Sequence, residues 1–321
     1  MRRTLASGPR PDVAVVIPTA RRETRLAFAL EALAAQTLAP DRFEVVVVRE
    51  DYPGPKAAAP EGLRVRFVPV GPGLGAAANR NVGWRATDAP LVAFTDDDCR
   101  PAPEWLERMV EAAERNSGVV LQGPTEPDPD ELERLHGLAV TQSILEPSPW
   151  YQTCNIAYPR ALLEELGGFD ERFDGGEDAD LGLRAVESGA TRVFVEGARV
   201  WHAVHSQHLW QAVRDHGRWH SIALVIAEHP AQRGELELGL FWRKGHSRVL
   251  LAAAGLLLRR RHPLLGLAAA VPYLRWHSQG VRRTPRGIMR GALDLPARAI
   301  VDLTGVAATA SAAARYRAPV L

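Results

Sequence analysis

The sequence predicts an α/β fold of the Rossmann-like type, in which helices flank a mostly parallel sheet, followed by a helical C-terminal extension that is basic and apolar. Two observations predict this fold. Short runs of Val, Ile and Leu alternate with segments of helical periodicity between residues 13 and 115, and parallel strands need such crossover helices between them. After about residue 206 the strand pattern stops and helical periodicity continues.

Each expected element rests on a local pattern. The first strand, 13–17, is a β-branched run that ends at Pro18. Leu26, Leu30 and Leu33 then recur at helical spacing and predict the first helix. The further strands are expected at 44–48, 65–68, 91–94 and 191–195, with a short extended piece at 199–201. The further helices are expected at 76–85, 101–115, 131–140 and 178–188, and regular secondary structure of unassigned type is expected at 161–166.

The whole-chain charge argues against a nucleic-acid coat. The 321 residues hold 39 Lys+Arg and 38 Asp+Glu, a formal net charge of +1, whereas binding along nucleic-acid phosphates needs a basic excess. The 2 cysteines, Cys99 and Cys154, exclude a disulfide scaffold and a multi-cysteine zinc module, and they fit a reducing compartment. No signal peptide is expected, because residues 1–12 lack an apolar run.

The charge is divided unequally along the chain. Residues 231–321 hold 15 Lys+Arg and 4 Asp+Glu, a net charge of +11, so residues 1–230 carry −10. This change of sign near His229 and Pro230 predicts one α/β domain over 1–230 and a separate helical region over 231–321.

Three adjacent carboxylates, Asp96, Asp97 and Asp98, follow the strand expected at 91–94. Ligands of doubly wound sheets lie at the carboxyl ends of the strands, and adjacent carboxylates repel unless solvent or a cation screens them. The triplet is therefore suited to Mg²⁺ or Mn²⁺, which can bridge two phosphates. The alternative is a solvated acidic turn that caps a helix opened by Pro101.

A second acidic group, Glu177-Asp178-Ala179-Asp180, follows two glycines at the start of an expected helix. The glycines leave room for a ligand near the backbone, and a carboxylate that faces such a ligand could act as a general base. The alternative is N-capping, which Asp supplies for the stability of the helix alone.

Five histidines gather after the last expected strand: His202, His205, His208, His216 and His220. A neutral imidazole binds transition metals, so a histidine directly after a strand could reach the aspartate triplet. The alternative is a polar surface or core histidine with no ligand.

A glycine-rich stretch, 71–75, precedes Arg80. It resembles a phosphate-binding turn, although neither the dinucleotide fingerprint nor the P-loop pattern is present. Arg80 could therefore contact a phosphate or pair with carboxylates of the protein.

Together and in this order, these pieces resemble the family 2 glycosyltransferases, which have the GT-A fold. The matching segments between residues 12 and 205 are Val15-Val16-Ile17-Pro18-Thr19, Gln36-Thr37, Phe43-Glu44-Val45, Arg80-Asn81-Val82-Gly83, Phe94-Thr95-Asp96-Asp97-Asp98-Cys99-Arg100-Pro101, Asn155, Gly167-Gly168-Phe169-Asp170 and Gly176-Glu177-Asp178-Ala179-Asp180-Leu181. Each segment is weak alone, but the ordered set is specific.

The resemblance implies an inverting transfer of a sugar from a nucleotide-diphosphate sugar to a hydroxyl acceptor. Asp96 and Asp98 match the family's DxD motif, with Asp96 toward the ribose and Asp98 on Mn²⁺ or Mg²⁺, and Asp96 is also expected among the metal ligands. His202, with His205 in reserve, matches the histidine that completes the metal site in some members. A divalent ion there would offset the charge on the departing diphosphate.

The resemblance also implies the base and the nucleotide contacts. Asp178 matches the aspartate that deprotonates the acceptor, and Glu177 would position the acceptor or the base. The residues expected to bind the nucleotide are Pro18, Thr19, Glu50, Arg80, Asp96 and Asp97.

Two departures from the family leave the nucleotide open. The family usually reads Val-Asp-Asp-Gly-Ser after the second strand, where this chain has Arg49 and Glu50 after Val48. Glu50 falls at the position of the base-reading aspartate and could accept a hydrogen bond from a base N–H. Ala20 stands where an aromatic residue often stacks on the base.

The C-terminal region lies outside these motifs. Its apolar runs, 249–258 and 264–274, are short of the roughly 20 residues that a spanning helix needs, and three arginines separate them. Apolar helices flanked by Arg and Trp suit a lipid interface, so peripheral membrane contact is expected through 241–290. The alternatives are a helical cap on the catalytic domain and a dimer contact.

These inferences combine into one functional hypothesis. The expected partners are a nucleotide-sugar donor and a glycan or glycolipid acceptor, lipid-linked or of the cell envelope, at the cytoplasmic face of the cell membrane. No nucleic acid is expected, and a homo-oligomer is compatible with the pattern. A catalytically silent binding or scaffold protein of the same fold is the alternative. Nucleotidyl transfer is disfavoured, because residues 18–25 lack a Gly-rich loop with a nearby Lys.

Overall fold

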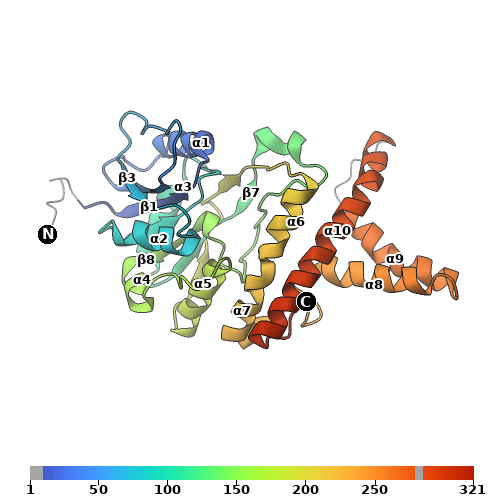
Figure 1. The fold of residues 1–321 in the computed structure, drawn as a ribbon. Coiled ribbons are helices and arrows are strands. Elements are labelled where there is room, and N and C mark those ends of the chain that lie inside the picture. The colour runs from blue at the N-terminus through green and yellow to red at the C-terminus, as the bar shows by residue number, and fades with distance from the viewer. Residues whose placement is uncertain (1–9, 279–284) are drawn as a thin grey trace. The chain divides into compact units, whose positions relative to one another are not determined.

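The computed structural model describes residues 10–278 and 285–321 (Figure 1). The chain divides into two compact units, which we call the sheet unit (Met1–Leu132 with Thr141–Ala203) and the helical unit (Glu133–Val140 with Val204–Leu321). The division therefore follows Ala203, whereas the charge pattern predicted a boundary at residue 230.

The sheet unit contains a seven-stranded sheet in the order β3-β2-β1-β4-β8-β6-β9. The strands are β1 (Val13–Thr19), β2 (Phe43–Glu50), β3 (Val65–Val70), β4 (Leu91–Phe94), β6 (Val120–Gln122), β8 (Ile156–Pro159) and β9 (Arg192–Phe194). All neighbouring strands are parallel except at β8, which is antiparallel to both β4 and β6. The predicted α/β fold with a mostly parallel sheet is confirmed.

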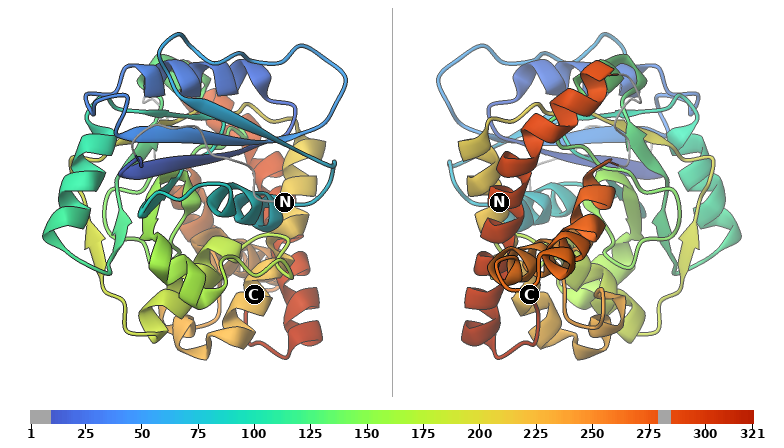
Figure 2. Two further views of the ribbon diagram at one scale, coloured as in Figure 1. Left: turned by 90° about the vertical axis from the view of Figure 1, so that its left-hand side faces the viewer. Right: turned by 90° about the vertical axis from the view of Figure 1, so that its right-hand side faces the viewer.

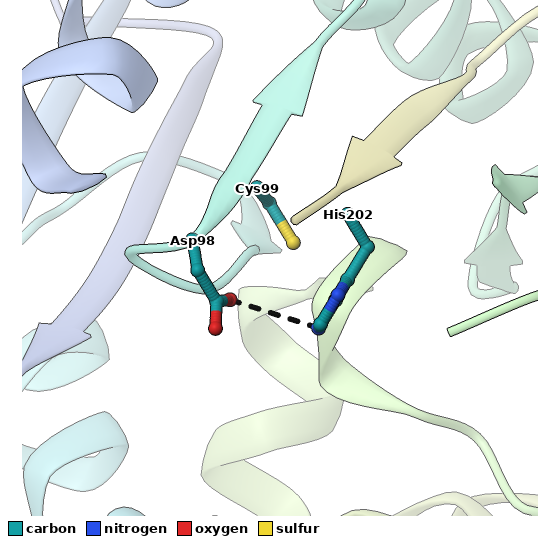
Figure 3. A group of neighbouring side chains, drawn as sticks. All are labelled: Asp98, Cys99 and His202. Atoms are coloured by element: carbon teal, nitrogen blue, oxygen red, sulfur yellow. Dashed lines mark ion pairs between the residues drawn. The ribbon is translucent and has the colours of Figure 1, made fainter. Parts of the chain in front are cut away.

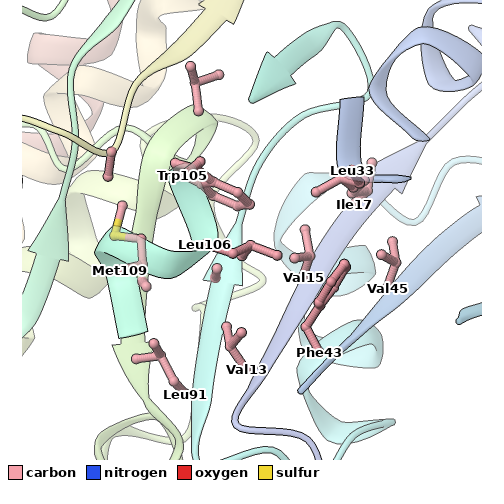
Figure 4. Packing of buried hydrophobic residues seen from close by; sticks show 14 of the residues in the cluster. Val13, Val15, Ile17, Leu33, Phe43, Val45, Leu91, Trp105, Leu106 and Met109 are labelled. Atoms are coloured by element: carbon pink, nitrogen blue, oxygen red, sulfur yellow. The ribbon is translucent and has the colours of Figure 1, made fainter. Parts of the chain in front are cut away.

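Helices cover both faces of this sheet, as the left panel of Figure 2 shows for α1 and α2. The helices are α1 (Glu23–Ala34), α2 (Ala76–Arg85), α3 (Trp105–Arg115), α4 (Arg160–Leu166) and α5 (Glu177–Glu187). Successive side chains of a strand point to opposite faces, so Val13, Val15 and Ile17 join the core under α1 and α3 (Figure 4). Val16 belongs to the core under α2, α4 and α5.

A second, three-stranded sheet lies in the order β5-β10-β7, built from β5 (Cys99–Pro101), β10 (Val200–His202) and β7 (Thr125–Pro127). The prediction of a helix from residue 101 is wrong at its start. β5 pairs with β10, the N–H of Ala102 donates to the carbonyl of Arg199, and α3 begins only at Trp105.

Two other sequence expectations are also corrected. Pro18 does not end the first strand, because β1 runs parallel to β2 as far as Thr19. The helix expected at 131–140 is a short 3₁₀ helix at Pro129–Arg134.

The helical unit contains α6 (Leu209–Gly217), α7 (Ser221–Glu228), α8 (Lys244–Leu258), α9 (Pro263–Ser278) and α10 (Pro285–Tyr316), with short 3₁₀ helices at Arg218–His220 and Pro230–Glu235. The right panel of Figure 2 shows α8 and α9 as a hairpin beside α10. Gly255 and Gly266 let its two helices approach, since a Cβ on Gly255 would lie 2.9 Å from the carbonyl oxygen of Gly266.

Among the described helices, none combines the length and the apolarity needed to cross a bilayer. Residues 279–284 of the segment expected to contact lipid lie outside the described residues.

Candidate active site

The aspartate triplet stands at the carboxyl edge of the sheet. It follows β4, whose Phe94 pairs with Val16 of β1, so it lies beside the end of β1. The side chains of Asp97 and Asp98 are only 6% and 5% exposed. A solvated acidic turn would expose its carboxylates to water, so that alternative does not fit these two residues. The triplet does not cap α3 either, because the N-cap position of that helix is Glu104 and has no side-chain cap.

Asp97 is bonded within the protein. The hydroxyl of Thr19 donates to its Oδ2 at 2.7 Å, and Arg22 pairs with its Oδ1 at 3.2 Å. Burial raises the pKa of Asp97 to about 7, against the opposing pull of Arg22. The middle carboxylate, predicted to bind nucleotide, therefore fastens the triplet to the end of β1.

Asp98, Cys99 and His202 form a group whose potential ligand atoms all lie within 4.8 Å of one another (Figure 3). The antiparallel register of β5 and β10 sets Cys99 opposite His202, although the two are far apart in the sequence. His202 Nε2 lies 3.7 Å from Asp98 Oδ1. The structure therefore brings the predicted pair of Asp98 and His202 together.

The orientation of His202 suits a metal ligand. Its Nδ1 lies 2.8 Å from the carbonyl oxygen of Ala203. A carbonyl oxygen only accepts, so this contact places a proton on Nδ1 and leaves Nε2 as the nitrogen that faces Asp98 and could bind a metal ion. His205, the alternative ligand, belongs to the helical unit, where it forms an isolated bridge with Val140.

Cys99 was not among the predicted site residues. Burial raises the pKa of its thiol well above the usual range, so the sulfur stays protonated and is a poor ligand for a hard cation. The remaining donors, a carboxylate and an imidazole, fit Mn²⁺ better than Mg²⁺, which prefers oxygen ligands. A sequence signal for Cys99 existed only in its place next to Asp98.

Arg22 is a second residue that the motifs did not indicate. It is the N-cap residue of α1, shortly after β1, and its Nη1 lies 2.5 Å from Asp98 Oδ2 while also contacting Asp97. Its side chain is 52% exposed, so it can leave this position. Arg22 thus supplies positive charge where a divalent ion would bind.

We expect Arg22→Gln to bind Mn²⁺ about fivefold to tenfold more tightly than the unaltered protein. The reason is that the ion no longer competes with the guanidinium group, whose ion pair with Asp98 is worth ~1 kcal/mol. The signal of free Mn²⁺ in electron paramagnetic resonance measures this affinity without any turnover. Arg21→Gln removes an exposed neighbouring charge and is the matched control. Unchanged or weaker Mn²⁺ binding in Arg22→Gln would contradict the assignment.

Arg80 connects the triplet to the second acidic group. It lies in α2 and is buried, and its guanidinium donates to Asp96 at 2.8 Å and to Glu177 at 2.6 Å. These two carboxylates raise its pKa against the effect of burial. Of the two options for Arg80, pairing with carboxylates is the one the structure contains.

Asp178 lies in the first turn of α5. Gly175 and Gly176 precede it with φ of 130° and 80°, a region that favours glycine, and they turn the chain into the helix. Gly176 is the N-cap residue, so Asp178 does not serve as the cap. Burial and the neighbouring charge of Glu177 raise the pKa of Asp178 to about 7, with Arg80 opposing. A carboxylate that ionises near neutral pH suits general-base chemistry.

Glu50 ends β2, next to the end of β1, and so reaches the same edge of the sheet as Thr19. The side-chain amide of Asn79 contacts its Oε1 at 3.5 Å. Arg49, where the family usually has an acid, is turned inward: it pairs with Glu23 at 3.1 Å and lies over the ring of Phe67. The departure at Arg49 therefore has a structural role.

Several residues that carried the resemblance hold the fold. Asn155 accepts from the indole of Trp105 at 2.8 Å and donates to the carbonyl of Pro124 at 2.8 Å. Gly168 has φ of 81°, and a Cβ there would lie 2.4 Å from Asn81 Oδ1. The close approach of α2 and the positive φ thus require a glycine at this position.

Two family models match this chain, and together they extend over residues 14–221. The model of "Glycosyl transferase family 2" matches residues 14–167, and that of "Glycosyltransferase like family 2" matches residues 147–221. The validoxylamine A glucosyltransferase of Streptomyces hygroscopicus subsp. limoneus is 29% identical over 215 residues, which cover 54% of this chain and 48% of that protein. The galactofuranosyltransferase GlfT2 of Mycobacterium tuberculosis is 29% identical over 249 residues, covering 61% of this chain and 38% of that protein. The chain thus spans about half or less of the length of these relatives.

Solved structures share the fold. The mannosyltransferase PcManGT of Pyrobaculum calidifontis, in complex with GDP-Man and Mn²⁺, aligns with a TM-score of 0.54 at 19% identity, over 94% of this chain and 87% of that one. Residues 1–349 of S. aureus TarS, in complex with UDP-GlcNAc, align with a TM-score of 0.51 at 17% identity, over 94% and 91%. The family matches over 14–221 and the shared fold agree with the ordered motifs, and the chain belongs to the family 2 glycosyltransferases.

Proposed function

We propose that this protein transfers a sugar, with inversion, from a nucleotide-diphosphate sugar to a hydroxyl group of a glycan or glycolipid. The observation that carries the proposal is the bridge through Arg80, which joins Asp96 of the DxD motif to Glu177 beside Asp178. The bridge links Asp96, which is suited to a diphosphate donor, to Glu177, the residue next to the expected base, through the buried Arg80.

In this proposal the nucleotide lies along the carboxyl edge of the sheet. Glu50 at the end of β2 accepts a hydrogen bond from the base, while Pro18 and Thr19 at the end of β1 line the path to the triplet. Asp96 lies toward the ribose. Two proteins of this fold carry GDP-Man with Mn²⁺ and UDP-GlcNAc, which supports a nucleotide-sugar donor.

Asp98 and His202 would hold Mn²⁺, or Mg²⁺ in its place. The ion offsets the negative charge that develops on the leaving diphosphate. Ala203 orients His202 through Nδ1, and the exposed Arg22 would leave Asp98 when the ion binds.

Asp178 would take the proton of the acceptor hydroxyl. The acceptor oxygen forms a bond to the anomeric carbon as the bond from that carbon to the diphosphate oxygen breaks, in a single displacement that inverts the configuration. The proton ends on Asp178, the bonding electrons leave with the nucleoside diphosphate, and Glu177 positions the base through its bond to Arg80.

We place the acceptor at the cytoplasmic face of the cell membrane, as a lipid-linked or cell-envelope glycan. The net charge of +11 in residues 231–321 supports this, since the cytoplasmic leaflet is anionic. Two buried cysteines without a disulfide support a reducing compartment.

A panel of nucleotide sugars tests the proposal by the release of nucleoside diphosphate in the presence of Mn²⁺. We expect one donor to be used, with activity abolished by a chelator and lowered at least about a hundredfold in Asp98→Ala, because the ion then lacks its carboxylate. Asp41→Ala, which removes an exposed carboxylate, is the control. Absence of release and of nucleotide binding across the panel would favour a catalytically silent protein of the same fold.

A further inference from the structure

Large apolar side chains are exposed at the tip of the hairpin formed by α8 and α9. Within the helical unit this tip extends away from α10 (Figure 1). The side chains, which we call the tip leucines, are between 50% and 83% exposed and are Leu256, Leu257, Leu258, Leu264, Leu265 and Leu267. A surface of this kind on a folded domain marks an interaction site.

The same tip is strongly basic. Residues 244–278 contain no Asp or Glu, and Arg259, Arg260 and Arg261 stand together at the turn between the helices. All three arginines are exposed. Leucine and arginine therefore meet at one end of the hairpin, with no acidic side chain in the hairpin to neutralise the arginines.

The other end of the hairpin is fixed by specific contacts. Tyr273 of α9 donates to Asp302 of α10 at 2.9 Å, and His277 lies 3.1 Å from the same carboxylate oxygen. Arg248 of α8 lies over the ring of Trp276 at 5.1 Å. The base is thus anchored to α10, whereas the tip leucines are left exposed.

We infer that the hairpin tip docks into the headgroup region of an anionic lipid bilayer. Leucines enter the boundary of the acyl chains while the arginine side chains extend to lipid phosphates, as amphipathic interfacial segments do. The helices of 15 and 16 residues are about 22–24 Å long, shorter than the ~30 Å hydrocarbon core, so the tip enters the leaflet without crossing it.

Charge favours lipid over a second copy of the chain. Two tips facing each other would bring two arginine triplets together without an acidic partner in the hairpin. On an anionic membrane, by contrast, each Arg near the surface raises the binding constant by about a factor of five. The inference rests on the proposed function only for the role of the docking, which is to hold the enzyme at the membrane that carries a glycolipid acceptor. Binding itself needs neither donor nor transfer.

Co-sedimentation of the full chain with vesicles tests this docking, with no nucleotide sugar present. We expect binding to phosphatidylcholine vesicles that contain about one-third phosphatidylserine and little binding to phosphatidylcholine alone. Replacing Arg259, Arg260 and Arg261 by Gln should weaken binding on the order of a hundredfold. Replacing Leu257, Leu264 and Leu265 by Ser should weaken it at least about tenfold, because apolar burial is lost.

Matched variants separate docking from general charge effects. Arg64, Arg108 and Arg115, all exposed and in the sheet unit, are replaced by Gln to give the same change in net charge, and binding should stay within about twofold. Equal binding to neutral vesicles, or binding unaffected by the tip variants, would overturn the inference. So would a dimer in sedimentation that the leucine variant abolishes, since the tip would then be a contact between copies. Release of nucleoside diphosphate by the tip variants with a soluble acceptor reports separately on the proposed function.

Discussion

Asp178→Asn is expected to lower kcat for transfer by about 10²–10⁴-fold while leaving donor binding nearly unchanged. The amide keeps the size of the side chain but cannot accept the acceptor's proton. Desolvation of this half-buried carboxyl group and the neighbouring charge of Glu177, with Arg80 opposing, already raise the pKa of Asp178 to about 7. Steady-state kinetics with the preferred donor measures kcat and KM separately.

The pH profile gives the same prediction a second readout. A base must be deprotonated, so kcat/KM of the unaltered enzyme should rise with pH and level off above about 7, the pKa of Asp178. Because this pKa is raised in the folded state, ionisation of Asp178 costs stability as the pH rises from the unfolded pKa through the folded one. Asp178→Asn should therefore melt at a higher temperature than the unaltered protein at pH 8, with no gain below pH ~4.

Asp174→Asn is the matched control, since it neutralises an exposed carboxylate shortly before α5. Its kcat and its melting temperature should both stay close to those of the unaltered protein. A purely structural Asp178 would show a loss of stability together with the loss of activity. A kcat in Asp178→Asn within tenfold of the unaltered value would remove the base from the mechanism.

The sequence predicted the strands and helices in which apolar residues form long runs or recur at a regular spacing. The strands at 13–17, 44–48 and 91–94 exist, and each contains at least four consecutive apolar residues. The strand at 65–68, with three apolar residues around Arg66, and the helix at 76–85 also exist. β5, β6, β7 and β8 were not predicted, because each is a segment of three or four residues with no clear alternation of apolar and polar side chains.

The sequence indicated the carboxylates of the site, His202 and Arg80, but it did not indicate Arg22. Asp98 and His202 meet only because β5 pairs with β10, a contact between distant segments that local patterns do not encode. The sequence left phosphate and carboxylate open as partners of Arg80, and the structure shows the pairs with Asp96 and Glu177, which come from distant segments. Arg22 could have been suspected from its place shortly after β1, at the strand end that the triplet shares.

Arg80→Met should lower the free energy of unfolding by about 3–5 kcal/mol, the largest loss of stability that we expect from any substitution in the site. Removing one partner of a buried ion pair leaves the other charge without compensation. Glu177 is 8% exposed and would remain buried, whereas Asp96 is 27% exposed and water can screen it. Urea denaturation at neutral pH measures the change.

A double substitution tests whether this loss comes from the bridge. In Arg80→Met combined with Glu177→Gln the uncompensated charge is gone, so a substantial part of the stability should return, and the coupling in the double-mutant cycle should exceed ~1 kcal/mol. Arg85→Met, on the same helix with an exposed side chain, should lose less than about 1 kcal/mol. Additive effects of Arg80→Met and Glu177→Gln would mean that Arg80 stabilises the protein through packing alone. The contacts of Arg80 with Asp96 and Glu177 would then contribute no coupling energy. The donor side of the site, at the triplet, and the acceptor side, at α5, would be stabilised independently.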